Sequence, residues 1–580
     1  MDMKSLFFLL ICLVINLFPL PSNATKLEPK PKSHEVTADN IYFGGDILTM
    51  HGDEPNYIEA LATAGEKIIY TGTLEGSKSF QNQTTTMVNL EGKTMLPGFV
   101  DPHSHLYGVG LQAVVANLLP SPDGQADSID QLIELLRESN QNPEQRLFTQ
   151  KTGWIFGFGY DDSLLERYPN KQDLDRASQD KPILMIHTSG HLSVANSKAL
   201  ELLGINAETP NPPGGIIRRF EDSLEPNGVM EENAHFAILL KLGKLIDIEL
   251  QDMMLKAAQK QYAKYGYTTA QEGRASAEAI EALSRASKKD TLLIDVVAYL
   301  DMLSNSEWMS SKYHSSDYLN RFRIGGVKLS FDGSPQGKTA WLTQPYFHPP
   351  HGQTPNYLGY PIFSDEQAFQ FVELALSKNW QLLTHANGDA AIGQFIDAVT
   401  AANQKLGTKD RRPVLIHGQT IRQDQIEKLS EQGIFPSLFP MHTFYWGDWH
   451  ADSVLGFPRA NFISPTKSVR DAQLMFSTHH DAPVALPNAL RVLDATVNRT
   501  TRSRRTLGPE QRVDVYTGIK AMTLWPAYQH FEEHNKGSLI VDKQADLIIL
   551  DKNPLKIDPT NLKDLVIFET ISRGKSVYQQ

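Results

Sequence analysis

The sequence predicts an α/β fold: a (β/α)₈ TIM-like barrel with a large insertion after its first strand, and a small β-sandwich domain built from both chain ends. Short apolar β-rich runs alternate with longer helix-like segments, which is the pattern of a parallel sheet covered by helices. Eight such runs occur, the number that closes a barrel. The chain has 580 residues, 41% of them hydrophobic, so it can bury a large core and a smaller companion domain.

Both ends of the chain carry short β-like runs separated by Gly and Asp turns. They lie within residues 25–98 and 536–580. The runs themselves are 40–43, 60–63, 67–70, 537–541, 545–550 and 564–568. Because this pattern of short β-like runs and turns occurs only at the two ends of the chain, we expect both ends to build one composite β-sandwich domain.

The barrel is expected over residues 99–535. Its strand candidates are 95–100, 267–271, 292–300, 326–331, 381–384, 413–416, 434–438 and 474–477. Such a barrel usually needs about 250 residues, so the long gap after the first candidate predicts an insertion at about residues 106–250. This insertion has its own strand candidate at 182–186 and a Pro/Gly-rich loop at 211–215. We expect it to cover the barrel mouth and to shape the substrate pocket.

The first 24 residues have the pattern of a signal peptide. Lys4 precedes an apolar run at 6–18, and small residues follow up to Ala24. This run is short for a membrane span, so we expect cleavage near Ala24 and a secreted or periplasmic protein without a stable membrane anchor. A non-cleaved anchor is the alternative. The one cysteine, Cys12, lies in this run, so the mature chain has no disulfides and no thiolate metal ligands.

The net charge of the chain indicates which classes of binding partner to expect. The formal net charge is -12, without a long basic run, and nucleic acids or anionic membranes attract clustered Lys and Arg. We therefore expect a small-molecule substrate and no nucleic acid. A homo-oligomer stays open.

A pair of histidines follows the first strand candidate. His103 and His105 are two residues apart, so in extended chain both rings point to the same side and can meet one metal. The spacing alone is weak evidence. With 18 His in the chain, chance places about 0.6 such pairs.

Other ionisable residues stand at or just past the ends of separate strand candidates. They are His385, His417 and Asp481. The carboxyl ends of barrel strands converge on the face where active sites lie. Lys328 lies inside an apolar strand candidate, where an uncompensated ammonium is costly. Either it reaches solvent from an edge strand, or it is a deprotonated amine modified by carbon dioxide into a carbamate that bridges two metals.

Residues 96–105, LPGFVDPHSH, resemble the opening metal motif of the amidohydrolase superfamily. Further stretches are similar to its branch of N-substituted formamide deformylase-like proteins (amidohydrolase family 3). They are GWI at 153–155, GYD at 159–161, HTSGH at 187–191, NS at 196–197, VK at 327–328, DGS at 332–334 and ADL at 545–547. The similarity covers essentially the whole mature chain. The loop 334–338 departs from the family's more Gly/Ser/Arg-like pattern, so no substrate contact is assigned there.

The resemblance implies a ligand set. His103 and His105 bind a first metal, His385 and His417 bind a second, Lys328 bridges them as a carbamate, and Asp481 completes the first site. One or two divalent ions are expected, with zinc preferred over iron or manganese. Such a metal lowers the pKa of bound water to about 7. Asp481 is the expected catalytic residue, which moves a proton from this water to the leaving nitrogen.

The leading hypothesis is hydrolysis of a non-peptide carbon–nitrogen bond in N-acyl amines, N-formyl amines or cyclic amides. Alternatives are ester or other carbonyl hydrolysis at the same site, a catalytically inactive secreted binding protein, and a metal-dependent isomerase or lyase. The barrel by itself does not choose among them.

Weaker candidates surround this set. His187 and His191 are expected to contact substrate from the insertion, and His442 and His450 are expected to line the pocket. For each, the alternative is a packed histidine with its polar tip hydrogen-bonded. The remaining candidates are His479 and His480, which precede Asp481 and are expected to orient it, and Glu232, Asp332 and Arg459 as supporting groups, for which ordinary salt bridges are an equal explanation.

Overall fold

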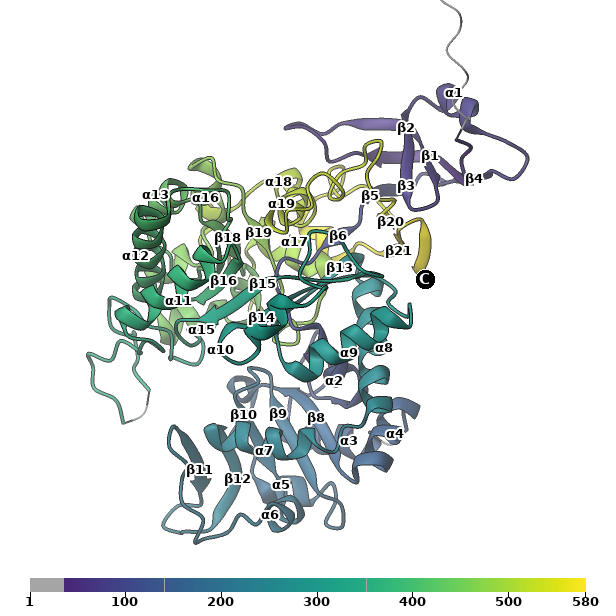
Figure 1. The fold of residues 1–580 in the computed structure, drawn as a ribbon. Helices are drawn as coiled ribbons and strands as arrows, with labels where there is room; N and C mark the ends of the chain where they lie inside the picture. Colours follow the sequence, from purple (N-terminus) through teal and green to yellow (C-terminus); the bar gives the residue numbers. More distant parts are fainter. Residues whose placement is uncertain (1–35, 140, 351) are drawn as a thin grey trace, which may run out of the picture.

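The computed structural model describes residues 36–139, 141–350 and 352–580 (Figure 1). The predicted signal peptide, residues 1–24, lies outside the described residues. Within these residues the strands form three sheets, and helices cover them to give a mixed α/β fold. No helix of the described part has both the length and the apolar character needed to cross a membrane.

The central sheet has eight strands that follow one another in chain order, and every neighbouring pair is parallel. The strands are β6 (Phe99–Val100), β13 (Tyr267–Ala275), β14 (Asp295–Asp301), β15 (Phe322–Ser330), β16 (Gln381–Ala386), β17 (Val414–His417), β18 (Phe435–Leu438) and β19 (Ser477–Thr478). Its two edge strands reach the same short segment, because Val100 N donates to Met522 O and Thr478 N donates to Ala521 O, both at 3.0 Å. This parallel sheet fits a TIM-like domain.

Helices between these strands begin and end at residues with the expected chemistry. Helix α11 (Asp365–Ser377) starts at a capping box, in which Ser364 Oγ accepts from Gln367 N and Gln367 Oε1 accepts from Ser364 N. Helix α13 (Gln423–Gln432) ends at Gly433, whose φ of 66° is favourable for glycine. Figure 1 shows both helices beside α12 (Asp389–Leu406), on the outer side of β16 and β18.

The strand predicted at 95–100 is wrong as a single element. Residues Thr94–Pro97 form β5, which pairs antiparallel with β20 (Leu547–Leu550) in another sheet. The chain changes sheets at Gly98, since Gly98 N donates to Asp546 O, whereas Phe99 N donates to Gly266 O. A Cβ on Gly98 would lie 2.4 Å from the Thr268 side chain, so the crossing needs glycine. A continuous apolar run does not reveal such a crossing.

Both chain ends join one hydrogen-bonded sheet of the order β22-β21-β20-β5-β1-β2-β3, with β4 paired to β1. Its remaining strands are β1 (Asn40–Leu48), β2 (Tyr57–Ala64), β3 (Lys67–Gly72), β4 (Thr86–Asn89), β21 (Ile567–Ser572) and β22 (Lys575–Gln579). Two predicted runs are wrong: 537–541 is irregular, and 564–568 contains the end of a 3₁₀ helix (Pro559–Asp564) before β21 begins. The sandwich arrangement stays a prediction.

Between β6 and β13 the chain forms a six-stranded sheet of the order β11-β12-β10-β9-β8-β7 with its own apolar core. The strands are β7 (Ala116–Asn117), β8 (Ile155–Tyr160), β9 (Ile183–His187), β10 (Leu192–Ala195), β11 (Gly215–Arg219) and β12 (Pro226–Glu232). Helix α2 (Leu106–Val114) precedes this sheet in the chain, and α8 (Ile248–Lys264), which follows it, packs against α2.

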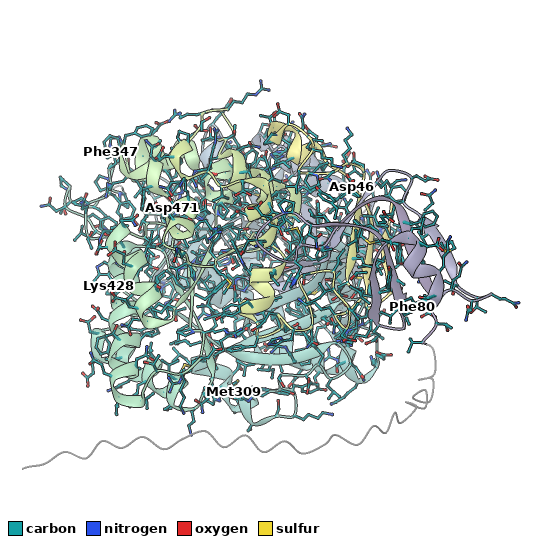
Figure 2. The ribbon with its side chains drawn as sticks, turned by 90° about the horizontal axis from the view of Figure 1, so that it is seen from above. Asp46, Phe80, Met309, Phe347, Lys428 and Asp471 are labelled. Carbon is teal, nitrogen blue, oxygen red and sulfur yellow. The ribbon has the colours of Figure 1, made fainter. Side chains whose placement is uncertain are left out.

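Figure 2 shows the sheet built from both chain ends, with Asp46 and Phe80, on the opposite side of the molecule from Lys428 and Asp471.

A buried ion network joins the end sheet to the parallel sheet. Lys536 Nζ lies 2.8 Å from Asp295 Oδ2 and 2.7 Å from Glu532 Oε2. It also donates to Thr269 Oγ1 at 2.9 Å. Asp295 accepts in turn from Arg573, in the turn between β21 and β22, whose Nη2 donates to Asp295 Oδ2 at 3.0 Å. Asp295 raises the pKa of Lys536 against the effect of burial, so the ammonium stays charged within this network.

We expect Lys536→Met to lower the stability of the protein by about 1–3 kcal/mol, because it removes a charged donor from two buried carboxylates, of which Asp295 keeps Arg573 and Glu532 keeps Arg323. Urea unfolding followed by circular dichroism measures the shift in midpoint. Lys78→Met, which removes an exposed lysine of a surface pair with Glu75, is the control and should change stability by no more than about 0.5 kcal/mol. Equal midpoints for the two variants would contradict the role given to the network.

Candidate metal centre

The predicted ligands meet at the carboxyl ends of the parallel strands. His103 and His105 follow β6, and Lys328 lies within β15. His385 stands near the end of β16, and His417 ends β17. The sixth residue, Asp481, follows β19. These residues are far apart in the sequence and are brought together by the order of the parallel strands.

Asp481 lies between the two histidines of the first motif. Its Oδ1 is 3.4 Å from His103 Nε2 and 3.3 Å from His105 Nε2, and each of the three residues offers one ligand atom within 4.8 Å of the others. Asp481 Oδ1 is buried and has no hydrogen-bond partner among the described residues. A buried carboxylate oxygen is costly without a partner, and imidazole and carboxylate are ligands of divalent metals. The donor set therefore fits a divalent metal ion.

Lys328 and the second histidine pair extend the cluster. Lys328 Nζ lies 3.0 Å from His103 Nε2, and His417 Nε2 lies 3.1 Å from His385 Nδ1. Burial lowers the pKa of Lys328 to about 7, and burial together with Lys328 lowers the pKa of His385 to about 3. Burial also holds the pKa of His417 well below its ordinary value. The imidazoles of His385 and His417 are therefore neutral at neutral pH, which is the form that binds metal.

Hydrogen bonds behind the ligands orient their rings. His103 Nδ1 donates to Gln271 Oε1 at 2.8 Å, and His385 Nε2 donates to Gly333 O at 3.0 Å. His103 Nε2 and His385 Nδ1 are thereby left as acceptors that face the cluster. Outer partners of this kind fix the tautomer and position of a metal-binding histidine.

His479 supports a different ligand from the one predicted. His417 Nε2 faces the cluster, so His417 Nδ1 carries the proton and donates to His479 Nε2 at 3.0 Å. His479 Nδ1 in turn lies 2.9 Å from Ser437 Oγ. The expectation that His479 orients Asp481 is therefore wrong.

His480 also points elsewhere. Its Nε2 lies 3.6 Å from Asp101 Oδ1, and its Nδ1 accepts from Ala482 N. The expectation that His480 orients Asp481 is therefore wrong. Adjacency in the sequence does not bring two side chains together, because successive side chains of extended chain point to opposite sides.

Asp101 is a supporting residue that the sequence reasoning did not assign. Its carboxylate accepts from His103 N at 3.1 Å, from Gln271 N at 2.9 Å and from the Ser104 hydroxyl. Burial raises its pKa to about 7 despite these hydrogen bonds. It fixes the turn that presents the first histidine pair. The available signal was its position in residues 96–105, two residues before His103.

Two ligands stand on unusual backbone. His417 has a φ of 76° and Asp481 a φ of 53°, in the left-handed region that residues other than glycine rarely adopt. Each such residue costs about 1–3 kcal/mol and persists where the surrounding structure determines it. Strain at two of the six predicted ligands is typical of a functional site.

Two connected cavities lead from the cluster. An inner cavity of about 70 Å³ is lined by His385, His417, His442 and Asp481, among others. An outer cavity of about 490 Å³ shares Ser189, His191, Ser334 and Gln336 with it. The segment between β6 and β13 supplies one wall of the outer cavity, including His187, and the loops after the parallel strands supply the other.

The predicted substrate-binding histidines occupy different places along this path. His191 lines both cavities, and its Nδ1 lies 2.9 Å from Glu232 Oε2. His187 lies in the outer cavity with its Nε2 3.0 Å from Asp162 Oδ1, and these two with Asp161 form a second group whose ligand atoms are close together. His442 lines the inner cavity.

Behind His442 lies a buried partner. His442 Nδ1 is 3.0 Å from His450 Nε2, and the two rings stack. His450 Nδ1 has no partner among the described residues, and burial lowers the pKa of His450 to about 3. His450 therefore supports His442 and is absent from the lining of both cavities, contrary to the prediction that it lines the pocket.

Of the other predicted supporting groups, Asp332 lies beside the cluster and Arg459 does not. Asp332 accepts from Asn387 N and Gly388 N at 2.9 and 2.7 Å, and it holds the loop after His385. Arg459 Nε donates to Leu455 O, in a separate pocket. The role of Arg459 as a support of the metal centre is therefore wrong.

We expect Gly273→Ala to lower metal affinity by about 10–100-fold, because the new Cβ would lie 2.5 Å from His103 Cε1 and 2.7 Å from Ser104 O. Metal content after dialysis against graded chelator measures the effect. Gly243→Ala is the control, since nothing lies within 4 Å of a Cβ at that helix position. Unchanged metal retention in the Gly273 variant would show that the His103 ring does not need this close approach.

The buried, neutral His450 should make the stability of the protein depend on pH. His450 has its pKa lowered from 6.5 to about 3, so between these values the unfolded chain binds a proton that the folded protein does not. Its neutral burial therefore stabilises fully above pH 6.5, and this stability is lost as the pH falls. From pH 7 to pH 5 the loss is about 2 kcal/mol. His450→Gln should reduce the drop in urea midpoint over this interval, whereas exposed His51→Gln should leave the drop unchanged.

Comparisons with known proteins agree with this geometry. A family model described as an amidohydrolase family matches residues 86–578. YtcJ of Bacillus subtilis (strain 168) is 28% identical over 552 residues, which cover 93% of this chain and 99% of that protein. N-substituted formamide deformylase of Arthrobacter pascens is 24% identical over 543 residues, covering 90% and 95% of the two chains.

A solved structure supports the same assignment. The crystal structure of an uncharacterized metal-dependent hydrolase from Pyrococcus horikoshii OT3 is similar at a TM-score of 0.71 and 25% identity, and covers 90% of this chain and 99% of that chain. The resemblance noted at residues 96–105 is thereby confirmed. The chain belongs to the amidohydrolase family.

Proposed function

We propose that this protein is a metal-dependent hydrolase that cleaves a non-peptide carbon–nitrogen bond, with an N-formyl or short N-acyl amine as substrate. The observation that carries the proposal is the buried Asp481 Oδ1, which has no hydrogen-bond partner among the described residues and lies 3.4 and 3.3 Å from His103 Nε2 and His105 Nε2. A carboxylate between two imidazoles at the base of a cavity is suited to bind a cation and to accept a proton from water.

His103, His105 and Asp481 would hold one divalent ion, and His385 and His417 would hold a second where two bind. Zinc is the ion we propose, since imidazole and carboxylate suit it. Lys328 would bridge as a carbamate. The pKa of about 7 that burial gives Lys328 supports this modification, because only the neutral amine reacts with carbon dioxide.

The metal supplies Lewis acidity and makes water nucleophilic at neutral pH. The chain's own residues do the rest. Asp481 takes a proton from the attacking water and returns it to the leaving nitrogen, as hydroxyl adds to the carbonyl carbon and the carbon–nitrogen bond breaks. Asp332 keeps the loop that carries His385 in place through its bonds to Asn387 N and Gly388 N.

Each of the two cavities is expected to bind a different part of the substrate. An inner space of about 70 Å³ holds a group the size of two or three waters, which favours a formyl or acetyl group there. The outer cavity of about 490 Å³ contains Asp161, Asp162, Trp446 and Trp449, and takes the amine portion. Ester hydrolysis by the same residues is the second candidate, since the metal centre does not itself distinguish nitrogen from oxygen leaving groups.

Three further expectations remain proposals. The parallel sheet is a closed (β/α)₈ barrel with residues 106–250 as its insertion, and the contacts of both edge strands with Ala521 and Met522 support closure. The two ends build a β-sandwich domain. Residues 1–24 direct secretion and are then removed.

The catalytic role of Asp481 is tested by Asp481→Asn at saturating zinc, with N-formylbenzylamine as substrate and amine release as the signal. We expect kcat/KM to fall by about 10²–10⁴-fold. Asp471→Asn, at an exposed position of helix α16 (Thr466–Asp471), is the control and should keep full activity. Activity of the Asp481 variant within tenfold of the unmodified protein would refute the role.

The substrate assignment has its own experiment. The metal-loaded protein is given N-formyl-, N-acetyl- and N-hexanoylbenzylamine, together with benzyl formate. We expect kcat/KM to be at least about tenfold higher for the formyl and acetyl amides than for the hexanoyl amide, because the longer acyl group does not fit the inner cavity. A tenfold ratio corresponds to a steric penalty of about 1.4 kcal/mol. Faster release from benzyl formate alone would favour the ester alternative. Product formed without ¹⁸O from labelled water would indicate an isomerase or lyase.

A further inference from the structure

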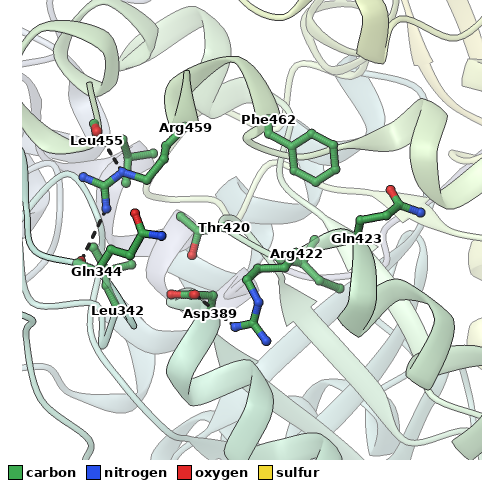
Figure 3. Close-up of a pocket in the computed structure, with 10 residues that line it drawn as sticks. Leu342, Gln344, Asp389, Thr420, Arg422, Gln423, Leu455, Arg459 and Phe462 are labelled. Carbon is green, nitrogen blue, oxygen red and sulfur yellow. Dashed lines mark hydrogen bonds and ion pairs between the residues drawn. The ribbon is translucent and has the colours of Figure 1, made fainter. Parts of the chain in front are cut away.

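We propose that a second, separate pocket binds a small monoanionic carboxylate with an apolar body. Figure 3 shows this pocket, which has a volume of about 350 Å³. Small-molecule sites commonly begin at roughly this size. The residues that line it are different from those that line the inner and outer cavities of the metal centre.

Its walls are largely apolar. Leu342, Ile421, Leu455 and Phe462 contribute side chains from three separate parts of the chain. Burying an alkyl or aryl group against such walls is favourable by about 25 cal/mol per Å² of apolar surface. The pocket therefore suits a ligand with an apolar body.

Arg459 supplies a positive charge without a counter-ion. Its guanidinium donates to three carbonyl oxygens, from Nε to Leu455 O at 2.9 Å, from Nη1 to Gln344 O at 3.3 Å and from Nη2 to Pro345 O at 2.7 Å. A guanidinium has five N–H groups, so two are left. Among the described residues it forms no ion pair; burial lowers its pKa, and the nearby carboxylate of Asp389 acts in the opposite direction. A half-buried guanidinium with two N–H groups left over is suited to bind an anion.

Arg422, across the pocket, differs in this respect. Its Nη1 lies 3.0 Å from Asp389 Oδ2, and its Nε and Nη2 each lie 2.9 Å from an oxygen of Asp424. Figure 3 shows Asp389 and Thr420 between the two arginines. The charge of Arg422 is thus already balanced by carboxylates.

The balance of charge selects the kind of anion. Of the two arginines in this pocket, Arg459 is the one without a carboxylate at ion-pair distance among the described residues, and Asp389 lines the same pocket, so a dianion such as phosphate would meet stronger repulsion than a single carboxylate. Thr420 and Gln344 add neutral polar groups beside the arginine. One cation, polar neighbours and apolar walls together match an alkyl or aryl carboxylate.

The pocket adjoins the metal centre through one residue. Thr420 N and Thr420 Oγ1 both donate to Asn387 O, at 3.0 and 2.9 Å. The Asn387 side chain lines the inner cavity. A carboxylate probe therefore has two places to bind, this pocket and the metal centre, and the test has to tell them apart.

Binding of hexanoate, phenylacetate, acetate and inorganic phosphate to the metal-loaded full chain is measured by isothermal titration calorimetry. We expect hexanoate and phenylacetate to bind at least tenfold more tightly than acetate, phosphate or the neutral hexanamide. Arg459→Met should weaken the binding of hexanoate by at least tenfold. Arg146→Met, at an exposed position of helix α4 (Pro143–Thr152), should leave the affinity for hexanoate within twofold.

A second variant keeps the test decisive if Arg459→Met unfolds. Phe462→Ala retains the charge and shortens one wall, so it should remove most of the advantage of hexanoate over acetate. Hexanoate binding that is unaffected by both variants and competes with the amide substrate would place the carboxylate at the metal centre and overturn the proposal. Equal affinity for hexanoate and hexanamide would overturn it as well.

Discussion

The Asp481 carboxylate, buried between the ring nitrogens of His103 and His105, is the feature on which the rest of the centre depends. Its Oδ1 lacks a hydrogen-bond donor among the described residues, and burying such a group is unfavourable unless a partner compensates it. Around it, burial lowers the pKa values of Lys328 and His385 to about 7 and about 3. These neighbours therefore offer the carboxylate less positive charge than an ordinary lysine and histidine would, and a divalent cation would supply the partner that it lacks.

This arrangement is held by structure outside the ligand set. His417 and Asp481 stand at positive φ, which costs free energy that the surrounding sheet has to offset. Asp101 fixes the turn before His103, and Gln271 fixes the orientation of its ring. The positions of these side chains therefore depend on packing and hydrogen bonds of residues outside the ligand set.

The sequence could predict the parts of the fold that depend on local pattern. The seven later strands of the parallel sheet each overlap or adjoin an apolar run, and ligands that follow such runs could be placed at one face. The crossing at Gly98 could not be predicted, because β5 and β6 are equally apolar and only their distant partners distinguish them. The same holds for Gln271 and His479, whose partners lie 168 and 62 residues away.

The division of labour between the two parts of the cavity follows from their origin. The proposed metal ligands stand on or just after strands of the parallel sheet, whereas His191 reaches the inner cavity from the segment between β6 and β13. Glu232 holds His191 twice, since Glu232 N donates to His191 O at 2.9 Å and the carboxylate contacts His191 Nδ1. A substrate in this space would thus meet a wall whose shape is set by β10 and β12, separately from the ligands. Changes in that wall can alter which substrate is accepted while the hydrolytic centre stays intact.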